Sequence, residues 1–306
     1  MTSFKTFLAE TAVKTTPQYQ AHPLDDVIKI LKSKCSKNLW MISSDRPIYR
    51  GDWNANQIPG GNEAAQKADV AFTVDTSATQ RKSTNTYNFY TEIFDSHPKM
   101  KAYPKRSRSF ICTTSRKMAA DYARHDGTGL WRIVPFDNAK IGIVGKPDIW
   151  HVGKNVELFN RKFEDLDGFN SLIRYLLTAV NIRSEKLEGL KKFGEMLKNP
   201  KSKAYSVLSD TIETQKLVDY GHGTTNRTNL IDAAISEEEV AALMKEISKD
   251  FMGYIYENLS PSVLGFELGS ENIKKHTNSE VWIGGDIVMF SAAAWKELQD
   301  RMGGEE

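Results

Sequence analysis

The chain has 306 residues, of which 40% are hydrophobic and 26% charged, and this composition supports a sizeable core in one or two domains. It has no apolar run of about 18 residues and no apolar centre of a secretory signal near its start. These features argue against a membrane span and predict a soluble protein of the cytoplasm, or of a host-cell interior if a phage or delivered protein. The net charge of +2 is too small to mark the whole chain as nucleic-acid-binding.

The two cysteines, Cys35 and Cys112, cannot form a disulfide framework. They also lack neighbouring His or Cys residues at metal-ligand spacing. We therefore expect neither redox chemistry nor a bound metal.

Hydrophobic spacing predicts the elements of the first third of the chain. Residues 24–34 repeat apolar positions at helical spacing, with acids first and lysines last, and predict an amphipathic helix. Residues 39–44 predict a short buried strand, and 47–53 a second extended piece. Residues 54–85, rich in Asn, Gly, Gln, Ser and Thr, predict a long loop, and 85–94 an aromatic helix.

A strand is predicted over 109–114, followed by a helix that Ser115 caps and that runs to Arg124. Two β-branched segments, 130–136 and 140–145, predict core strands. The chain up to Trp150 is therefore expected to form a mixed sheet with a few helices.

From 156 to 259 the periodic segments are helical. A helix with breaks is predicted across 172–197, and Ser236 with Glu239 forms a capping box for a helix that extends to Leu259. Strands return at 279–290, before a helix that Ser291 caps. The expected fold class is α+β, in which 1–155 and 263–306 form a mixed-sheet core and 156–262 a helical insertion or subdomain.

Four common enzyme motifs, GxxxxGKS, GxGxxG, HExxH and GxSxG, are absent from the sequence. Three separated fragments remain: PIYRG around Arg50, SFICTTS around 112–115, and NSEVWIGG around Glu280. Together they resemble the Arg, Ser-Thr-Ser and Glu motifs of the toxin-like ADP-ribosyltransferases of phage or bacterial type. The resemblance covers roughly 39–150 and 275–290. It implies a transferase that takes NAD as substrate.

The resemblance implies that Arg50 and Gly51 bind NAD. Arginine presents a planar fork of donors that matches a pyrophosphate, and lysine does not. Gly51 would let the backbone pass close to the ligand. The alternative for Arg50 is a surface residue at a strand end.

Glu280 is the expected catalytic residue. Cleavage between the ribose C1′ and nicotinamide develops positive charge on the sugar, as in glycoside hydrolysis. A fixed carboxylate beneath that sugar stabilises the charge where it appears. The alternative is an exposed glutamate on an edge strand.

Hydroxyl and aromatic side chains are expected to complete the NAD site. Residue type identifies the family's triplet with Thr113, Thr114 and Ser115, whereas counting from Phe110 starts it at Cys112. Ser115 would also serve as a helix N-cap whatever the function. Aromatic side chains of the 85–94 helix, Tyr87 and Tyr90 foremost, could form a wall for nicotinamide, although core packing explains them equally well.

Asn278 stands where family members that modify arginine carry a second glutamate. An amide cannot act as a general base, but it can orient an acceptor by hydrogen bonds. This argues against arginine as the target and leaves asparagine, cysteine, a nucleobase or water. Members that modify nucleic acid also lack the paired glutamates.

The stretch 99–108 is basic, and it leads into the strand of the triplet. Lys105, Arg106 and Arg108 are the expected acceptor-binding residues, because their charges would attract a phosphate backbone. The same residues could serve the NAD phosphates, or form only a solvated loop.

The predicted function is therefore an NAD-dependent mono-ADP-ribosyltransferase that modifies a macromolecule, with nucleic acid favoured over protein. Two alternatives remain. One is an NAD glycohydrolase, which uses the same site and passes the ribosyl group to water. The other is a non-catalytic binding protein on a degenerate transferase fold.

Overall fold

A computed structural model describes residues 17–44, 46–52, 63, 66–76, 89–123, 128–149, 152, 156–163, 165–184, 186–213, 228–230 and 235–303. The chain divides into two compact units. Unit 1 comprises Met1–Asn85, Ala102–Pro147 and Glu267–Glu306, and unit 2 comprises Thr86–Lys101 and Asp148–Phe266. Among the described residues, no helix has the length and apolar character needed to cross a bilayer.

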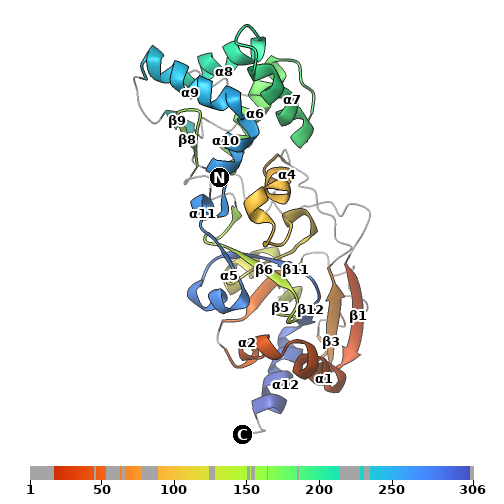
Figure 1. The fold of residues 1–306 in the computed structure, drawn as a ribbon. Coiled ribbons are helices and arrows are strands. Elements are labelled where there is room, and N and C mark those ends of the chain that lie inside the picture. The colour runs from red at the N-terminus through yellow and green to blue at the C-terminus, as the bar shows by residue number, and fades with distance from the viewer. Residues whose placement is uncertain are drawn as a thin grey trace. The chain divides into compact units, whose positions relative to one another are not determined.

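The fold is α+β, as predicted, and unit 1 is built on a nine-stranded sheet in the order β1-β3-β12-β5-β2-β4-β11-β6-β10. Figure 1 labels six of its strands, β1, β3, β5, β6, β11 and β12. Neighbouring strands from β1 to β6 in this order pair antiparallel. The strands are β1 Gln18–Pro23, β2 Ile48–Gly51, β3 Val70–Asp75, β4 Phe110–Thr113, β5 Leu130–Pro135, β6 Lys140–Val144, β10 Phe266–Leu268, β11 Glu280–Gly284 and β12 Ile287–Phe290.

Unit 1 also contains helices and short 3-10 turns. These are α1 Leu24–Lys34, η2 Ser36–Asn38, α2 Trp40–Ser43, η5 Arg106–Arg108, α5 Arg116–Tyr122, η7 Ser270–Lys275 and α12 Ala292–Gly303.

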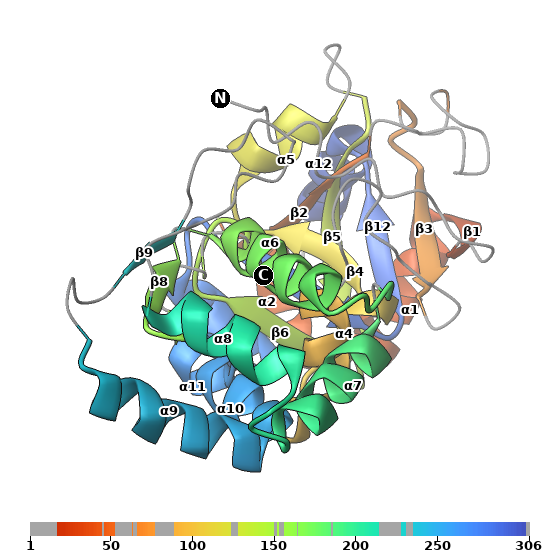
Figure 2. The ribbon, with the colours of Figure 1, turned by 90° about the horizontal axis from the view of Figure 1, so that it is seen from above.

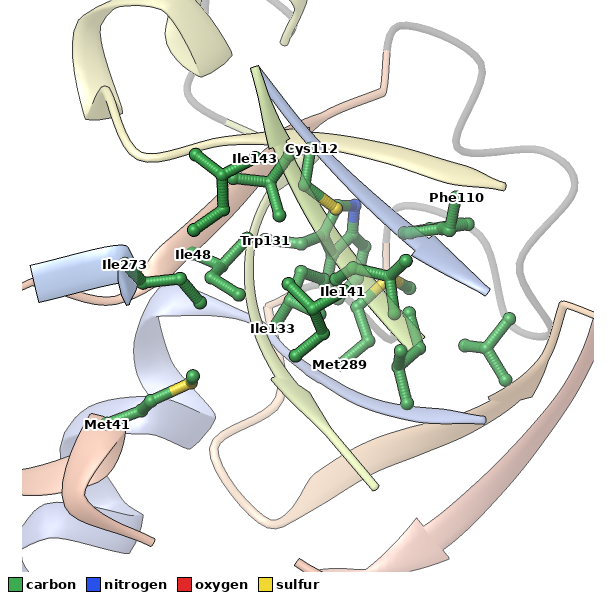
Figure 3. Close-up of a cluster of buried hydrophobic side chains, with 14 of the residues drawn as sticks. Met41, Ile48, Phe110, Cys112, Trp131, Ile133, Ile141, Ile143, Ile273 and Met289 are labelled. Carbon is green, nitrogen blue, oxygen red and sulfur yellow. The ribbon is translucent and has the colours of Figure 1, made fainter. Parts of the chain in front are cut away.

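The strand β12, inside the sheet of unit 1, is buried on both faces. Along β12, Val288 and Phe290 enter an apolar cluster with side chains of α1 and α12, whereas Ile287 and Met289 enter a second cluster on the other face. This follows from the alternation of side chains along a strand. The second cluster draws residues from β2, β3, β4, β5, β6, β11 and β12, and Figure 3 shows Cys112 among its side chains.

Most predicted elements of unit 1 are confirmed. The helix over 24–34, the six strands predicted at or after Arg50 and the final helix are present. Ser115 and Ser291 act as the expected caps: the Ser115 hydroxyl accepts from the backbone nitrogen of Met118 at 3.3 Å, and that of Ser291 from Ala294 at 3.0 Å.

Three predictions for unit 1 were wrong or incomplete. Residues 39–44 contain the helix α2 instead of a strand, because a short apolar run does not distinguish the two. The predicted loop 54–85 contains β3, whose Ala71, Phe72 and Val74 are fully buried. The edge strand β1 was not predicted, since its mostly exposed polar residues carry no apolar signal.

Unit 2 is mainly helical, and α7, α8, α9 and α10 pack against one another (Figure 2). The predicted insertion 156–262 lies within this unit, which also takes in Thr86–Lys101. Its elements are α4 Phe89–Ser96, η4 Pro98–Met100, β7 Glu157–Leu158, β8 Arg161–Phe163, α6 Leu166–Ala179, α7 Leu187–Leu197, α8 Lys203–Glu213, β9 Thr228–Leu230, α9 Glu237–Lys249, α10 Phe251–Asn258 and α11 Pro261–Leu264.

The capping box of Ser236 and Glu239 is confirmed at the start of α9. The helix predicted to continue to Leu259 is interrupted at Asp250, whose carboxylate caps α10 by accepting from the backbone nitrogen of Gly253 at 2.8 Å. The strands β7, β8 and β9 were not predicted, because segments of two or three residues show no periodicity.

Gly51 lies directly against α5. A Cβ at this position would lie 1.9 Å from the carbonyl oxygen of Ala119 and 2.7 Å from the Cβ of Tyr122. Both atoms are fixed to the helix backbone, so neither can move without moving α5. The close approach that requires glycine is therefore made by a helix, which corrects the expectation that it is made by a ligand.

We predict that Gly51→Ala lowers the free energy of unfolding by at least about 2 kcal/mol, because α5 must be displaced from β2. Urea denaturation measures the change. The control is Gly303→Ala at the end of α12, where a Cβ meets no atom within 4 Å and a change of no more than about 0.5 kcal/mol is expected. Equal changes in the free energy of unfolding in the two variants would show that α5 can move away from β2 at little cost.

Candidate functional site

The strands that carry the three motifs are neighbours in the sheet, in the order β2, β4, β11. Tyr49 of β2 pairs with Thr113 of β4, and Thr113 pairs with Glu280 of β11. Paired residues of an antiparallel ladder lie on the same face. Tyr49, Thr113 and Glu280 therefore form one row across three strands.

A small cavity of about 40 Å³ lies at this row. It is lined by Tyr49, Arg50, Gly51, Ile111, Cys112, Thr113, Met118, Ala119, Tyr122, Pro147 and Glu280. The volume suits one or a few water molecules, whereas sites for larger ligands measure about 300–1,000 Å³. NAD could therefore place only a part of itself here.

The Glu280 carboxylate is buried and oriented by two neighbours. The indole Nε1 of Trp282 donates to its Oε1 at 2.5 Å, and the Nε of Arg106 lies 4.0 Å from the same oxygen. The Glu280 side chain is only 6% exposed. The alternative of an exposed glutamate on an edge strand is wrong, because β11 lies between β4 and β6.

Arg106 is not available to an acceptor, contrary to prediction. It is only 2% exposed, and its guanidinium carbon lies 5.9 Å from the centre of the Trp282 ring. A buried guanidinium cannot meet a phosphate backbone at the surface. Lys105 and Arg108 are exposed, so the surface charge expected of this turn comes from these two residues.

Arg50 lies on the other face of β2, because side chains alternate and Tyr49 belongs to the Glu280 row. Its guanidinium carbon lies 4.4 Å from the centre of the Phe110 ring, and its Nη1 donates to the carbonyl of Ile111 at 2.6 Å. Asp52 Oδ2 lies 3.9 Å from Nη2, and the Arg50 side chain is 17% exposed. Arg50 is thus held at the strand end and partly accessible.

The hydroxyls of the triplet have different partners. Thr113 Oγ1 accepts from the backbone nitrogen of Ser115 at 3.1 Å, and Thr114 Oγ1 accepts from that of Ser279 at 2.9 Å. Ser115 uses its hydroxyl as the cap of α5, and Cys112 belongs to an apolar cluster. Thr113 is therefore the triplet residue whose position, opposite Glu280, fits a role beside the carboxylate.

The remaining predicted residues lie apart from this row. Asn278 is exposed, two residues before Glu280. Tyr90 belongs to unit 2, where it is fully buried and packs edge-on to Phe94 with 6.0 Å between ring centres. This corrects its expected role, because a ring buried in that packing cannot form a wall for nicotinamide. Tyr87 lies outside the described residues.

Sequence reasoning missed Trp282 and the buried position of Arg106. Trp282 could have been found, because it follows Glu280 by two residues on a strand and so shares its face. No local pattern distinguishes Arg106 from the exposed basic residues beside it. Among the described residues, no group of three or more His, Cys, Asp and Glu side chains could hold a metal ion.

Comparisons of the chain with models of protein families, with curated proteins and with solved structures gave no match. The three motifs and their arrangement are therefore what supports a functional assignment.

We predict that Arg106→Met lowers the free energy of unfolding by about 2–4 kcal/mol, because it leaves the Glu280 charge buried beside an apolar side chain. The matched control is Arg108→Met on the same turn, where exposure limits the change to about 0.5 kcal/mol. In a Glu280→Gln background the loss at Arg106 should shrink, since the buried negative charge is gone. An undiminished loss in that background would mean that Arg106 stabilises the protein independently of Glu280.

Proposed function

We propose that the chain is an NAD-dependent mono-ADP-ribosyltransferase with Glu280 as its catalytic residue. The observation that carries the proposal is the row Tyr49, Thr113, Glu280 on adjacent strands, in which a buried carboxylate is fixed at a cavity. The strands of this row also carry the three motifs of the transferase resemblance. Motif order and strand adjacency thus support the same assignment.

In the proposed reaction, the bond between ribose C1′ and the nicotinamide nitrogen breaks, and its electron pair leaves with nicotinamide. The ribose becomes oxocarbenium-like, and the Glu280 carboxylate stabilises this positive charge. The acceptor then forms a bond to C1′ and loses a proton. The contacts from Trp282 and Arg106 both fall on Oε1, so they set the direction of the carboxylate before NAD binds.

The cavity suits only a small part of NAD, and the rest of the dinucleotide would extend beyond it. Arg50 remains the proposed ligand of the pyrophosphate, at the end of β2, where its fork is partly exposed. Arg50 and Glu280 both line the cavity, but their side chains lie on opposite faces of the sheet, so NAD would have to pass the strand end to contact both. Arg50 therefore supports the proposal less directly than Glu280 does.

Asn278 is the proposed acceptor-orienting residue, since it is exposed and lies next to the catalytic strand. Nucleic acid remains the favoured acceptor, with Lys105 and Arg108 as the exposed cations of the basic turn. The proposed place of action is a cell interior, the chain's own or a host's.

Specific observations favour each of the two alternatives. The burial of Arg106 reduces the basic surface near the site and favours water as acceptor, which would make the protein an NAD glycohydrolase. The position of the Arg50 side chain on the opposite face favours a binding protein on a degenerate transferase fold, for which no NAD turnover is expected.

We predict that Glu280→Gln loses NAD turnover by about a hundredfold or more while the protein stays folded, because the amide keeps the shape but not the charge. The assay uses labelled NAD with separate pools of RNA, duplex DNA and protein, and Glu297→Gln on α12 is the control. Label on a pool supports transfer, and free ADP-ribose alone supports hydrolysis. Wild-type turnover in a folded Gln variant would remove Glu280 from the chemistry.

We predict that Arg50→Lys weakens NAD binding about tenfold, since lysine keeps the charge but loses the bidentate fork. Titration calorimetry measures the affinity, and Arg46→Lys, on the approach to the same strand, is the control. An unchanged affinity in Arg50→Lys would leave Arg50 with a structural role on Phe110. A loss in Arg46→Lys alone would transfer the binding role to Arg46.

A further inference from the structure

Three side chains of unit 1 form a hydrogen-bonded chain beside the start of β11, and the proposed reaction does not use them. Glu267 Oε1 lies 3.2 Å from Nε2 of His276, and Nδ1 of His276 lies 3.2 Å from the hydroxyl of Ser279. The His276 side chain is 15% exposed and Ser279 is buried. Ser279 directly precedes Glu280.

The chemistry of these groups gives the chain a direction. An ionised carboxylate only accepts hydrogen bonds, so Nε2 of His276 donates to Glu267. In a neutral imidazole the other nitrogen, Nδ1, is then an acceptor, and the Ser279 hydroxyl donates to it. Glu267 thus selects the tautomer of His276 that carries its proton on Nε2, in which Nδ1 accepts from Ser279.

Ser279 is also tied to the strand of the triplet. Its backbone nitrogen donates to Thr114 Oγ1 at 2.9 Å, and its carbonyl accepts from the backbone nitrogen of Thr114 at 2.9 Å. The backbone nitrogen of His276 donates to the carbonyl of Ile273 at 3.0 Å. The segment 276–279 is therefore anchored at both ends. The bond between His276 and Ser279 joins these two ends and closes the segment into a loop.

Asn278 lies inside this closed segment and is exposed, as is Thr277. We propose that His276, held by Glu267, is a positioning residue that fixes Asn278 relative to Glu280 for the transfer step. The inference rests on the proposed function. Attack on C1′ by a macromolecular acceptor depends on orientation, whereas attack by water does not need Asn278. We call the bonds from His276 to Glu267 and Ser279 the clamp. Loss of the clamp therefore reduces transfer and leaves NAD hydrolysis in place.

Two substitutions separate the hydrogen bonds of His276. The amide of Asn reaches the place of Nδ1 and can keep the bond to Ser279, whereas the amide of Gln reaches the place of Nε2 and can keep only the bond to Glu267. With labelled NAD and the same pools of RNA, DNA and protein, His276→Gln should lower transfer five- to tenfold with hydrolysis within twofold of wild type. His276→Asn should keep most of the transfer.

Hydrogen exchange at the amides of 276–280 provides a readout that needs no activity. Exchange should rise in His276→Gln and stay near wild type in His276→Asn. The matched control is His22→Gln, which removes another partly buried histidine, bonded to Thr73 Oγ1 at 2.8 Å. It should change neither the ratio of transfer to hydrolysis nor the exchange at 276–280.

An unchanged ratio of transfer to hydrolysis together with unchanged exchange in His276→Gln would overturn the inference. So would an equal fall of both rates, which indicates a structural role only. Hydrolysis without transfer in the wild type would contradict the transferase assignment and the acceptor role of the clamp together. If the wild type does not turn over NAD, the proposed function fails by itself, and exchange alone decides whether His276 holds the segment.

Discussion

The candidate site depends on the register in which β11 pairs with β4. In this register Val281 and Ile283 enter the apolar cluster, and Glu280 and Trp282 lie on the opposite face. A shift by one residue would exchange the two sets and place the carboxylate in the apolar cluster. Three hydrogen bonds oppose such a shift. Two join Thr114 and Ser279, one between their backbones and one to the Thr114 hydroxyl, and the third runs from the Glu280 nitrogen to the carbonyl of Lys146 at 3.0 Å.

The same register decides which charges meet. It brings Glu280, which has Trp282 beside it on the same strand, to Arg106, so that a buried negative charge has a donor and a cation beside it. Arg106 offsets part of the field that Glu280 would exert on a developing cation, but it also makes burial of the carboxylate tolerable. The proposal therefore requires that orientation of Glu280 outweighs this partial neutralisation.

Local signals predicted much of the fold. The helix caps at Ser115, Ser236 and Ser291 could be predicted, because a serine just before a helical apolar pattern can bond the free backbone nitrogens of the first turn without help from distant residues. The helix α2 and the polar edge strand β1 were missed, because their conformation depends on tertiary packing and pairing. At the candidate site, the sequence predicted Glu280 and left two positions for the triplet, of which Thr113 is the residue that pairs with Glu280. The burial of Arg106 and the face of Arg50 could not be predicted, because they depend on strand pairing and on contacts between distant segments.

The central claim, that Glu280 acts on the ribose of NAD, is tested most directly by a crystal structure of the protein with a non-cleavable NAD analogue. The account predicts that C1′ of the nicotinamide ribose lies within about 4 Å of the Glu280 carboxylate, with the pyrophosphate near Arg50. An analogue bound on the Arg50 face alone, with its ribose away from Glu280, would contradict it.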